Sequence, residues 1–230
     1  CAIRDAFSWE QRNVRIYAGM GLIFPGAIPP ITGEFDPTLD RDSVTRNLER
    51  ARQRLADAGW NEDNLPVLEW ASTAGTRNRE MFEQFRGNIT EAGYPQEKVD
   101  IRTFANFGDF NAALKNRELM IYGMGWGLDY PDAENTMQLF YGPNSSPGSN
   151  SSNYEKPEFD ALYERTAVMQ SGTERTALYS QMNQMLIDDC VGMMSISRQT
   201  IEVWHKDVIG LPERNVLGGY WLRFVDVVSE

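Results

Sequence analysis

Two residue types that carry much of protein chemistry are scarce, since the 230 residues contain two cysteines and one histidine. Cys1 and Cys190 belong to no Cys-x-x-Cys or Cys/His pattern, which argues against a zinc site or a thioredoxin-like redox pair. Cys190 ends an apolar helical pattern, so we expect it in the core. A lipid anchor on Cys1 is not favoured, because an amphipathic pattern follows at Ala2–Ile16 instead of a flexible polar linker. His205 lies beside Trp204, which favours a structural role over metal binding, and a single histidine restricts Ser/His or Cys/His chemistry.

Long apolar runs and an excess of basic residues are also missing. No run reaches the roughly 18 residues of a membrane span, and no charged-then-apolar signal segment is present. The chain has 33 acidic and 22 basic residues and a net charge of −11, with no Lys/Arg cluster, so we do not expect nucleic acid as a partner. Gly-x-Ser-x-Gly, P-loop and Gly-x-Gly-x-x-Gly motifs are absent as well. With 41% hydrophobic residues, the composition is that of a folded globular protein.

The middle of the chain alternates between strand and helix patterns. The expected elements are a strand at Pro66–Ser72, a helix at Thr76–Ala92, a strand at Val99–Phe104, a helix at Phe107–Asn116 and a strand at Leu119–Trp126. Short connections between them predict an α/β fold with a mostly parallel sheet flanked by helices. Ligands of such sheets gather beyond the carboxyl ends of the strands, where Ser72, Thr73 and residues 126–132 would lie.

Helical patterns also flank this region. We expect helices at Ala2–Ile16, Asp42–Ala58, Pro157–Met169 and Thr173–Asp189, the last opened by a capping box from Ser171 to Glu174. The proline-rich residues 21–37 predict an extended segment that crosses the surface. Further strand-like pieces are Met193–Ser197, Thr200–Trp204 and the tail Tyr220–Val228.

Six sequence stretches occur in an order and spacing typical of one family. They are AIRDAFSWEQ, IFPGAIPP, RLADAGW, the signature GWGLDYPDAENTMQLFYGPNSS, NYEKPEFDALYERTAVMQ and VWHKDVIGL. Together they resemble the extracellular solute-binding proteins of family 5, which serve peptide, opine and nickel ABC importers. The resemblance implies two lobes of the periplasmic-binding-protein type II fold around a ligand cleft. It places residues 1–205 in the second, C-terminal lobe and residues 206–230 in a return segment toward a first lobe.

The same resemblance implies a protein that captures a solute without chemistry or a cofactor. It implies a periplasmic or extracellular location and membrane permease subunits as partners, with the binding protein itself a monomer. Because members of the family are longer, the chain would hold half of the cleft and bind ligand weakly by itself. A peptide or peptide-like ligand is the first expectation; an oligosaccharide, an opine or a metal chelate remains open.

Asp129 is the sharpest candidate for a ligand contact, because an acidic residue at this place in peptide-binding relatives pairs with the ligand's α-amino group. A partly desolvated carboxylate suits an ammonium ion. Alternatively, Asp129 turns the chain or caps a helix that begins near Asp132. Trp126 and Tyr130 are candidates for stacking on the ligand, although an aromatic residue after a buried strand often belongs to the core.

Other candidate ligand contacts are Asp132, Ser72, Thr73 and, from the cleft rim, Asn153, where a plain surface turn is the alternative. Many relatives have Asp-Pro where this chain has Asp132-Ala133, which leaves the register of the carboxylates open. A Ca²⁺ site is not expected here, because the acidic spacing does not fit an EF-hand loop. A carboxylate-based hydrolase is the least favoured alternative, since the acids lie too close in sequence to flank a glycosidic bond. A permease-docking module is the remaining one.

Overall fold

The computed structural model describes residues 1–193, 195–199, 203–210 and 225–228, and its elements follow the α/β order predicted from the sequence. In chain order the elements are α1 (Ala2–Ala6), α2 (Trp9–Tyr17), β1 (Leu22–Ile23), α3 (Leu48–Asp57), β2 (Leu68–Thr73), α4 (Thr76–Glu91), η1 (Gln96–Lys98), β3 (Val99–Phe104), α5 (Phe107–Lys115), β4 (Ile121–Tyr122), α6 (Glu134–Met137), η2 (Gln138–Phe140), η3 (Gly142–Asn144), α7 (Pro157–Ala167), α8 (Thr173–Asp188), β5 (Ile196–Ser197), β6 (Val208–Ile209) and β7 (Asp226–Val227).

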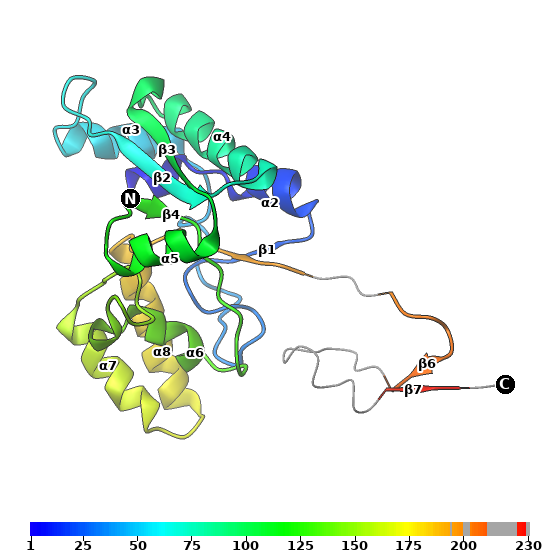
Figure 1. Cartoon of the computed structure of the whole chain (residues 1–230). Helices are drawn as coiled ribbons and strands as arrows, with labels where there is room; N and C mark the ends of the chain where they lie inside the picture. Colours follow the sequence, from blue (N-terminus) through cyan, green and yellow to red (C-terminus); the bar gives the residue numbers. More distant parts are fainter. Residues whose placement is uncertain (194, 200–202, 211–224, 229–230) are drawn as a thin grey trace.

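A parallel sheet in the order β3-β2-β4 occupies the upper half of the molecule (Figure 1). Leu68 pairs with Val99, and Trp70 pairs with Ile121, so the predicted parallel arrangement is confirmed. The third strand is shorter than predicted: β4 pairs only through Ile121 and Tyr122, and the chain then leaves the sheet. Residues 123–133 are therefore free to form a loop beyond the strand end.

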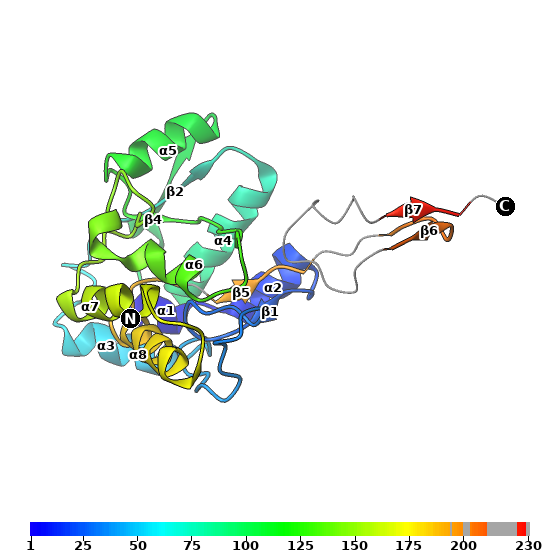
Figure 2. The same cartoon turned by 90° about the horizontal axis from the view of Figure 1, so that it is seen from below.

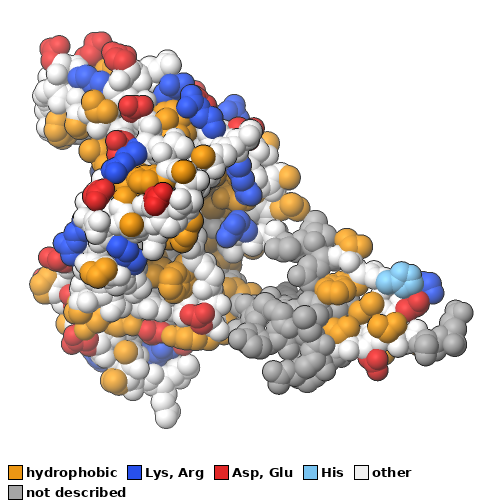
Figure 3. Space-filling view, in the orientation of Figure 1, with side chains coloured by type: hydrophobic (Ala, Val, Ile, Leu, Met, Phe, Trp, Pro, Cys, Tyr) orange, Lys and Arg blue, Asp and Glu red, His pale blue; other side chains and the backbone are white. Residues whose placement is uncertain are grey.

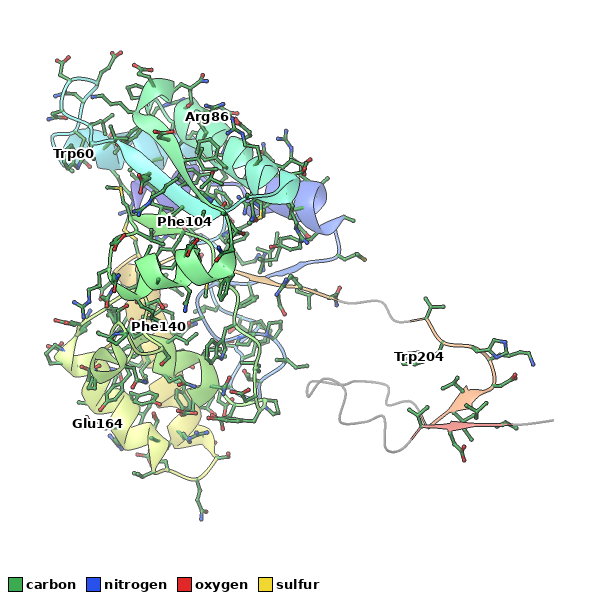
Figure 4. The ribbon with its side chains drawn as sticks, in the orientation of Figure 1. Trp60, Arg86, Phe104, Phe140, Glu164 and Trp204 are labelled. Carbon is green, nitrogen blue, oxygen red and sulfur yellow. A yellow bond between two sulfur atoms is a disulfide. The ribbon has the colours of Figure 1, made fainter. Side chains whose placement is uncertain are left out.

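Helices cover both faces of this sheet. Successive side chains of β2 point to opposite sides and are apolar on each side, so both faces need a packing partner. On one face, Trp70 packs in a core cluster with Phe82 and Phe85 of α4, and α1 to α3 contribute to the same cluster. On the other face, Ala71 packs against Phe110 and Leu114, and Phe104, labelled at the strand end in Figure 4, joins them. The sheet is thus buried on both sides, as parallel sheets are.

A second cluster fills the lower half, where α6, α7 and α8 pack together (Figures 1 and 2). Its buried members include Met137, Phe140, Phe159 and Tyr179. Ala27 and Ile28 of the proline-rich segment also belong to this cluster, and they are 7% and 3% exposed. The prediction that residues 21–37 cross the surface is therefore wrong for this part, because the apolar residues between the prolines are buried in the hydrophobic core of the lower half.

The N-terminal helix is two helices rather than one. The Ser8 hydroxyl accepts a hydrogen bond from the Gln11 N–H and caps α2, while the Ser8 N–H donates to Asn88 at 2.9 Å. The next helix begins at Leu48, six residues later than predicted, because the side chain of Asn47 caps it. The predicted capping box is also wrong: Gly172 precedes α8 without a side-chain cap, and Glu174 pairs with Arg165.

Cys1 and Cys190 form a disulfide, with their Cα atoms 5.2 Å apart. The expectation that Cys190 lies in the core is therefore wrong, since the residue is half-buried and its sulfur is bonded to Cys1. The two residues are 189 positions apart in sequence, so no local pattern could indicate the bond. It joins the start of α1 to the turn after α8, and so links the elements of the two halves.

Beyond β5, residues 203–210 and 225–228 form an arm away from the body, which carries the antiparallel pair β6 and β7 (Figures 1 and 2). Trp204 lies on this arm, and His205 is 3.1 Å from Asp207 (Figure 4). The expected strand at 200–204 and the start of the tail at 220–228 fall largely outside the described residues. Acidic and basic side chains alternate on the visible face of the body (Figure 3). Among the described helices, none combines the length and the apolar character that crossing a bilayer requires.

Candidate functional site

The loop of residues 123–133 connects β4 to α6 at the carboxyl edge of the sheet. Its aromatic side chains are open to solvent: Trp126 is 46% exposed and Tyr130 is 43% exposed. Asp129 is exposed as well, and its carboxylate has no hydrogen-bond or ion-pair partner among the described residues. Two flat rings and a carboxylate without a partner in the described ranges therefore share one short loop.

Asn135, in the first turn of α6, is hydrogen-bonded to this loop through its side chain. Its side-chain oxygen accepts one hydrogen bond from Trp126 Nε1 at 2.9 Å and another from the Asp129 backbone N–H at 3.3 Å. Asn135 is 1% exposed, and it lies between Ala133 and Met137, which are both fully buried. The loop is thus attached to a packed helix through a single amide oxygen.

Tyr130 is tied to the same helix by its hydroxyl group. The carboxylate of Glu134 accepts hydrogen bonds from both Tyr130 and Tyr163 of α7. The Tyr163 ring stacks on Tyr141 with the ring centroids 4.6 Å apart. The hydrogen bond to Glu134 is the largest cause that raises the pKa of Tyr130 above its ordinary value. Glu134 is therefore a link between the loop and α7.

Asp132 faces inward toward Arg175 of α8 rather than toward solvent. Its two oxygens accept hydrogen bonds from Arg175 at 2.7 and 2.9 Å, and one of them also accepts the Glu134 N–H at 2.9 Å. Burial acts to raise the pKa of Asp132, but the bonds from Arg175 and Glu134 outweigh it and hold the pKa below its usual value. Asp132, and not Asp129, thus bonds to the N-terminus of α6, although the N-cap residue itself is Ala133.

Glu34, from the proline-rich segment, completes this polar group. Its carboxylate lies 3.3 Å from Arg175 Nη1 and also accepts the Ala133 N–H at 3.3 Å. The Arg175 side chain is 8% exposed, so its charge is nearly desolvated and needs both acids. Sequence reasoning missed Glu34 and Arg175, because a charged residue in an amphipathic helix or a loop carries no signal of burial. It missed Asn135 for the same reason.

Ser72 and Thr73 lie apart from the loop, in an open groove of about 810 Å³ at the carboxyl ends of β2 and β3. Arg15, Arg79 and Thr103 also line this groove, whereas no residue of 126–132 does. Thr73 is held in place, since Asn78 Nδ2 donates to its carbonyl oxygen and to its hydroxyl at 2.9 Å. The structure therefore places the candidate residues at one sheet edge, but in two separate surfaces.

Asn153 belongs to neither surface. Its backbone is left-handed, with φ of 54°. Its side-chain oxygen accepts the Ser146 N–H at 3.0 Å, and its Nδ2 donates to the Ser151 carbonyl at 3.2 Å. Both polar atoms are thus engaged inside the loop that they stabilise. No group of three or more His, Cys, Asp or Glu side chains suited to a metal ion occurs within the described ranges.

Comparison with known sequences finds a family and several relatives. The pattern of the bacterial extracellular solute-binding proteins, family 5 Middle, matches residues 3–148, which include the loop and Asn135. Heme-binding protein A of Haemophilus influenzae is 23% identical over 169 residues, 72% of this chain and 30% of that protein. The dipeptide-binding protein of Escherichia coli is 24% identical over 200 residues, 85% of this chain and 36% of that protein. The chain thus spans about a third of the length of these curated relatives.

Solved structures show the same fold. HbpA2 from Haemophilus parasuis superposes with a TM-score of 0.79 at 21% identity, covering 99% of this chain and 44% of that one. DppA from Helicobacter pylori, a periplasmic binding protein in complex with the peptide STSA, superposes with a TM-score of 0.73 at 21% identity, covering 83% and 36%. The fold is therefore that of a lobe of the type II periplasmic binding proteins, as the sequence predicts.

Proposed function

Since the chain belongs to the bacterial extracellular solute-binding proteins of family 5, we propose that it forms one wall of the ligand cleft in the substrate-binding component of an ABC importer. The ligand is a peptide or a peptide-like solute with a free amine. The protein captures it outside the cytoplasmic membrane, in the periplasm or at the cell surface, and delivers it to the permease as a monomer. No chemical step is part of this function.

The observation that carries the proposal is the state of Asp129. Its backbone is fixed by Asn135, while its carboxylate is exposed and has no partner among the described residues. A positioned carboxylate without an internal cation is suited to pair with an ammonium group of a ligand. Trp126 and Tyr130, exposed on the same loop, offer flat surfaces for the neighbouring peptide unit or side chain.

The relatives support the same class of ligand. Two of them are described as a dipeptide-binding protein and a di/tripeptide-binding protein, and the solved DppA contains a peptide. We further propose that residues 1–205 form the second lobe and residues 206–230 a return toward a first lobe. The arm that carries β6 and β7 away from the body supports this division (Figure 1).

A metal chelate is the second candidate ligand. One relative is described as a heme-binding protein, and Met120 and Met124 are 57% and 51% exposed on the same stretch of chain as Trp126. Methionine side chains adapt to flat apolar ligands. A chelate without an amine would bind independently of Asp129, so the same variant separates the two candidates.

The test is isothermal titration calorimetry with the longest natural polypeptide that contains residues 1–230. The ligands are Phe-Ala-Ala, its N-acetylated form and haem. We expect Asp129→Asn to weaken binding of the free-amine peptide about tenfold or more, since a charge-assisted hydrogen bond is lost. Asp63→Asn, the same change at an exposed turn residue, is the control and should leave binding unchanged. Equal affinity of wild type and Asp129→Asn for the free-amine peptide would contradict the amine role, and no binding of either peptide would contradict the peptide class.

A further inference from the structure

Trp126 and Asp129 hydrogen-bond to the same oxygen atom, although the loop that carries them has no regular secondary structure. Residues 123–128 form neither helix nor strand, so the hydrogen-bond ladders of such elements do not fix them. The side-chain oxygen of Asn135 receives the indole N–H at 2.9 Å and the Asp129 N–H at 3.3 Å. Both groups are donors, so the atom that faces them must be the amide oxygen rather than the amide nitrogen.

The amide nitrogen of Asn135 plays no comparable part. Its Nδ2 is buried and has no hydrogen-bond partner among the described residues. A buried donor without a partner destabilises the fold, so the favourable contacts of this side chain with the loop are the two hydrogen bonds that its oxygen accepts. The residue is therefore suited to one task, which is to hold two donors of the loop at once.

The helix that carries Asn135, α6, is anchored to the rest of the lower half by buried and polar contacts. Ala133 and Met137 on either side are fully buried in the lower core cluster. Asp132, just before α6, is paired with Arg175 of α8, and Ala133 N–H bonds to Glu34. Two segments distant in sequence, the proline-rich segment through Glu34 and α8 through Arg175, thus fix α6, and through Asn135 they fix the loop.

We propose that Asn135 is a positioning residue that sets the Trp126 indole and the Asp129 carboxylate in one fixed relation, so that an amine and the adjoining part of the ligand are recognised together. This inference rests on the proposed function for its ligand. The positioning itself is a property of the unliganded protein and is testable without any ligand.

The variants follow from the roles of the two amide atoms. Asn135→Leu keeps the size of the side chain and removes the acceptor. Asn135→Asp keeps an acceptor oxygen, replaces the Nδ2 donor and introduces a carboxyl group into a buried site, so its exchange rate is compared with wild type only if the variant is folded. Asn183→Leu is the matched control, because Asn183 is 4% exposed in the same lower half and its oxygen accepts the Ala27 N–H at 2.7 Å, whereas no described hydrogen bond joins it to residues 123–133. Far-UV circular dichroism establishes that each variant is folded.

The first measurement is solvent exchange of the Trp126 indole proton in the ¹⁵N-labelled full chain without ligand. The six tryptophans give separate indole signals, and Trp126→Phe identifies the relevant one. We expect Asn135→Leu to accelerate exchange about tenfold, the effect of losing one hydrogen bond, while Asn135→Asp and Asn183→Leu leave it near wild type. An unchanged rate in Asn135→Leu, or an equal increase in Asn183→Leu, would overturn the proposal.

The second measurement is the affinity for Phe-Ala-Ala in the longest natural polypeptide that contains this chain. Asn135→Leu should weaken binding about tenfold and Asn183→Leu should not. Faster indole exchange with unchanged affinity would overturn the link between positioning and recognition. If exchange responds as expected but the wild type binds no peptide, the proposed function fails while the positioning of the loop stands.

Discussion

Arg175 donates two hydrogen bonds to the carboxylate of Asp132, from Nη1 to Oδ2 at 2.7 Å and from Nη2 to Oδ1 at 2.9 Å. The pair joins the first turn of α8 to the residues just before α6, 43 positions earlier in the chain. Because α6 also supports the candidate ligand loop, this ion pair connects the stability of the lower core to the geometry of the site.

We predict that Asp132→Asn lowers the free energy of unfolding by about 2 to 3 kcal/mol, because it leaves the Arg175 charge buried beside Glu34 alone. The value is smaller than for a fully buried pair, since the Asp132 side chain is 25% exposed. Urea unfolding at pH 7 measures it. Asp63→Asn, an exposed control, should change the free energy by less than about 0.5 kcal/mol.

The same pair predicts a dependence on pH. The folded-state pKa of Asp132 is lowered, so its stabilisation is complete above the unfolded-state pKa of about 3.9 and is lost as the pH falls through the folded-state pKa. Between about pH 4 and pH 2, the wild type should therefore lose more stability than Asp132→Asn does. Parallel curves of unfolding free energy against pH for the two proteins would show that Asp132 is not responsible.

Reduction of the Cys1–Cys190 disulfide should lower the free energy of unfolding by about 2 to 5 kcal/mol, since the bond closes a loop of nearly the whole chain and restricts the unfolded state. Urea unfolding with and without a phosphine reductant measures this. The double variant Cys1→Ser/Cys190→Ser should match the reduced wild type and show no response to reductant. A response of the double variant would mean that the reductant acts elsewhere.

Arg12 is a buried cation without an acidic partner in the part of the chain that the structure describes. Its guanidinium lies over the rings of Phe7 and Trp70 and donates to Gln84 and to the Met81 carbonyl, and burial lowers its pKa to about 10. We predict that Gln84→Leu, which leaves this charge with one acceptor fewer, costs about 3 kcal/mol. Arg12→Met, which removes the charge and keeps an unbranched chain, should cost about 1 kcal/mol. Thermal unfolding at pH 7 ranks the two variants, and the reverse order would contradict this account.

Gly26 and Gly19 have the same backbone angle but different surroundings. Both have φ of +76°, yet a Cβ on Gly26 would lie 2.2 Å from Asn183 Oδ1, whereas nothing lies within 4 Å of one on Gly19. Gly19→Ala should therefore cost about 1 kcal/mol for the left-handed backbone alone. Gly26→Ala should cost about 1 to 3 kcal/mol more, because the side chain of Asn183 must move. Equal melting temperatures of the two variants would contradict a tight contact at Gly26.

The sheet and its helices were predictable because their signals are local. β3 has the bounds predicted for it, and α4 and α5 end within one residue of the prediction. In each, apolar periodicity is bounded by turn residues, so neighbours in sequence settle the conformation. The candidate loop was located for the same reason, since a polar stretch follows an apolar strand and carries a recognisable order of residues.

The same local reasoning failed where a partner far along the chain decides. The break between α1 and α2 is held in part by the hydrogen bond from Ser8 N–H to Asn88, 80 positions later in the chain, and Asp132 turns inward because Arg175 lies opposite. Asp129 and Asp132 are chemically identical and three positions apart, so their sequence could not tell which one remains open to solvent. Which of the two carboxylates is exposed depends on α8, which lies more than 40 residues away in the sequence.

From the sequence alone follow the α/β alternation, the parallel sheet edge and the family of extracellular solute-binding proteins, because periodicity and motif order are properties of neighbouring residues. Only the tertiary structure decided that Cys1 meets Cys190, that Glu34 and Arg175 enclose Asp132, and that Asn135 holds Trp126 and Asp129 with one oxygen. These contacts form when packing brings distant segments together, and burial then makes each hydrogen bond between them strong.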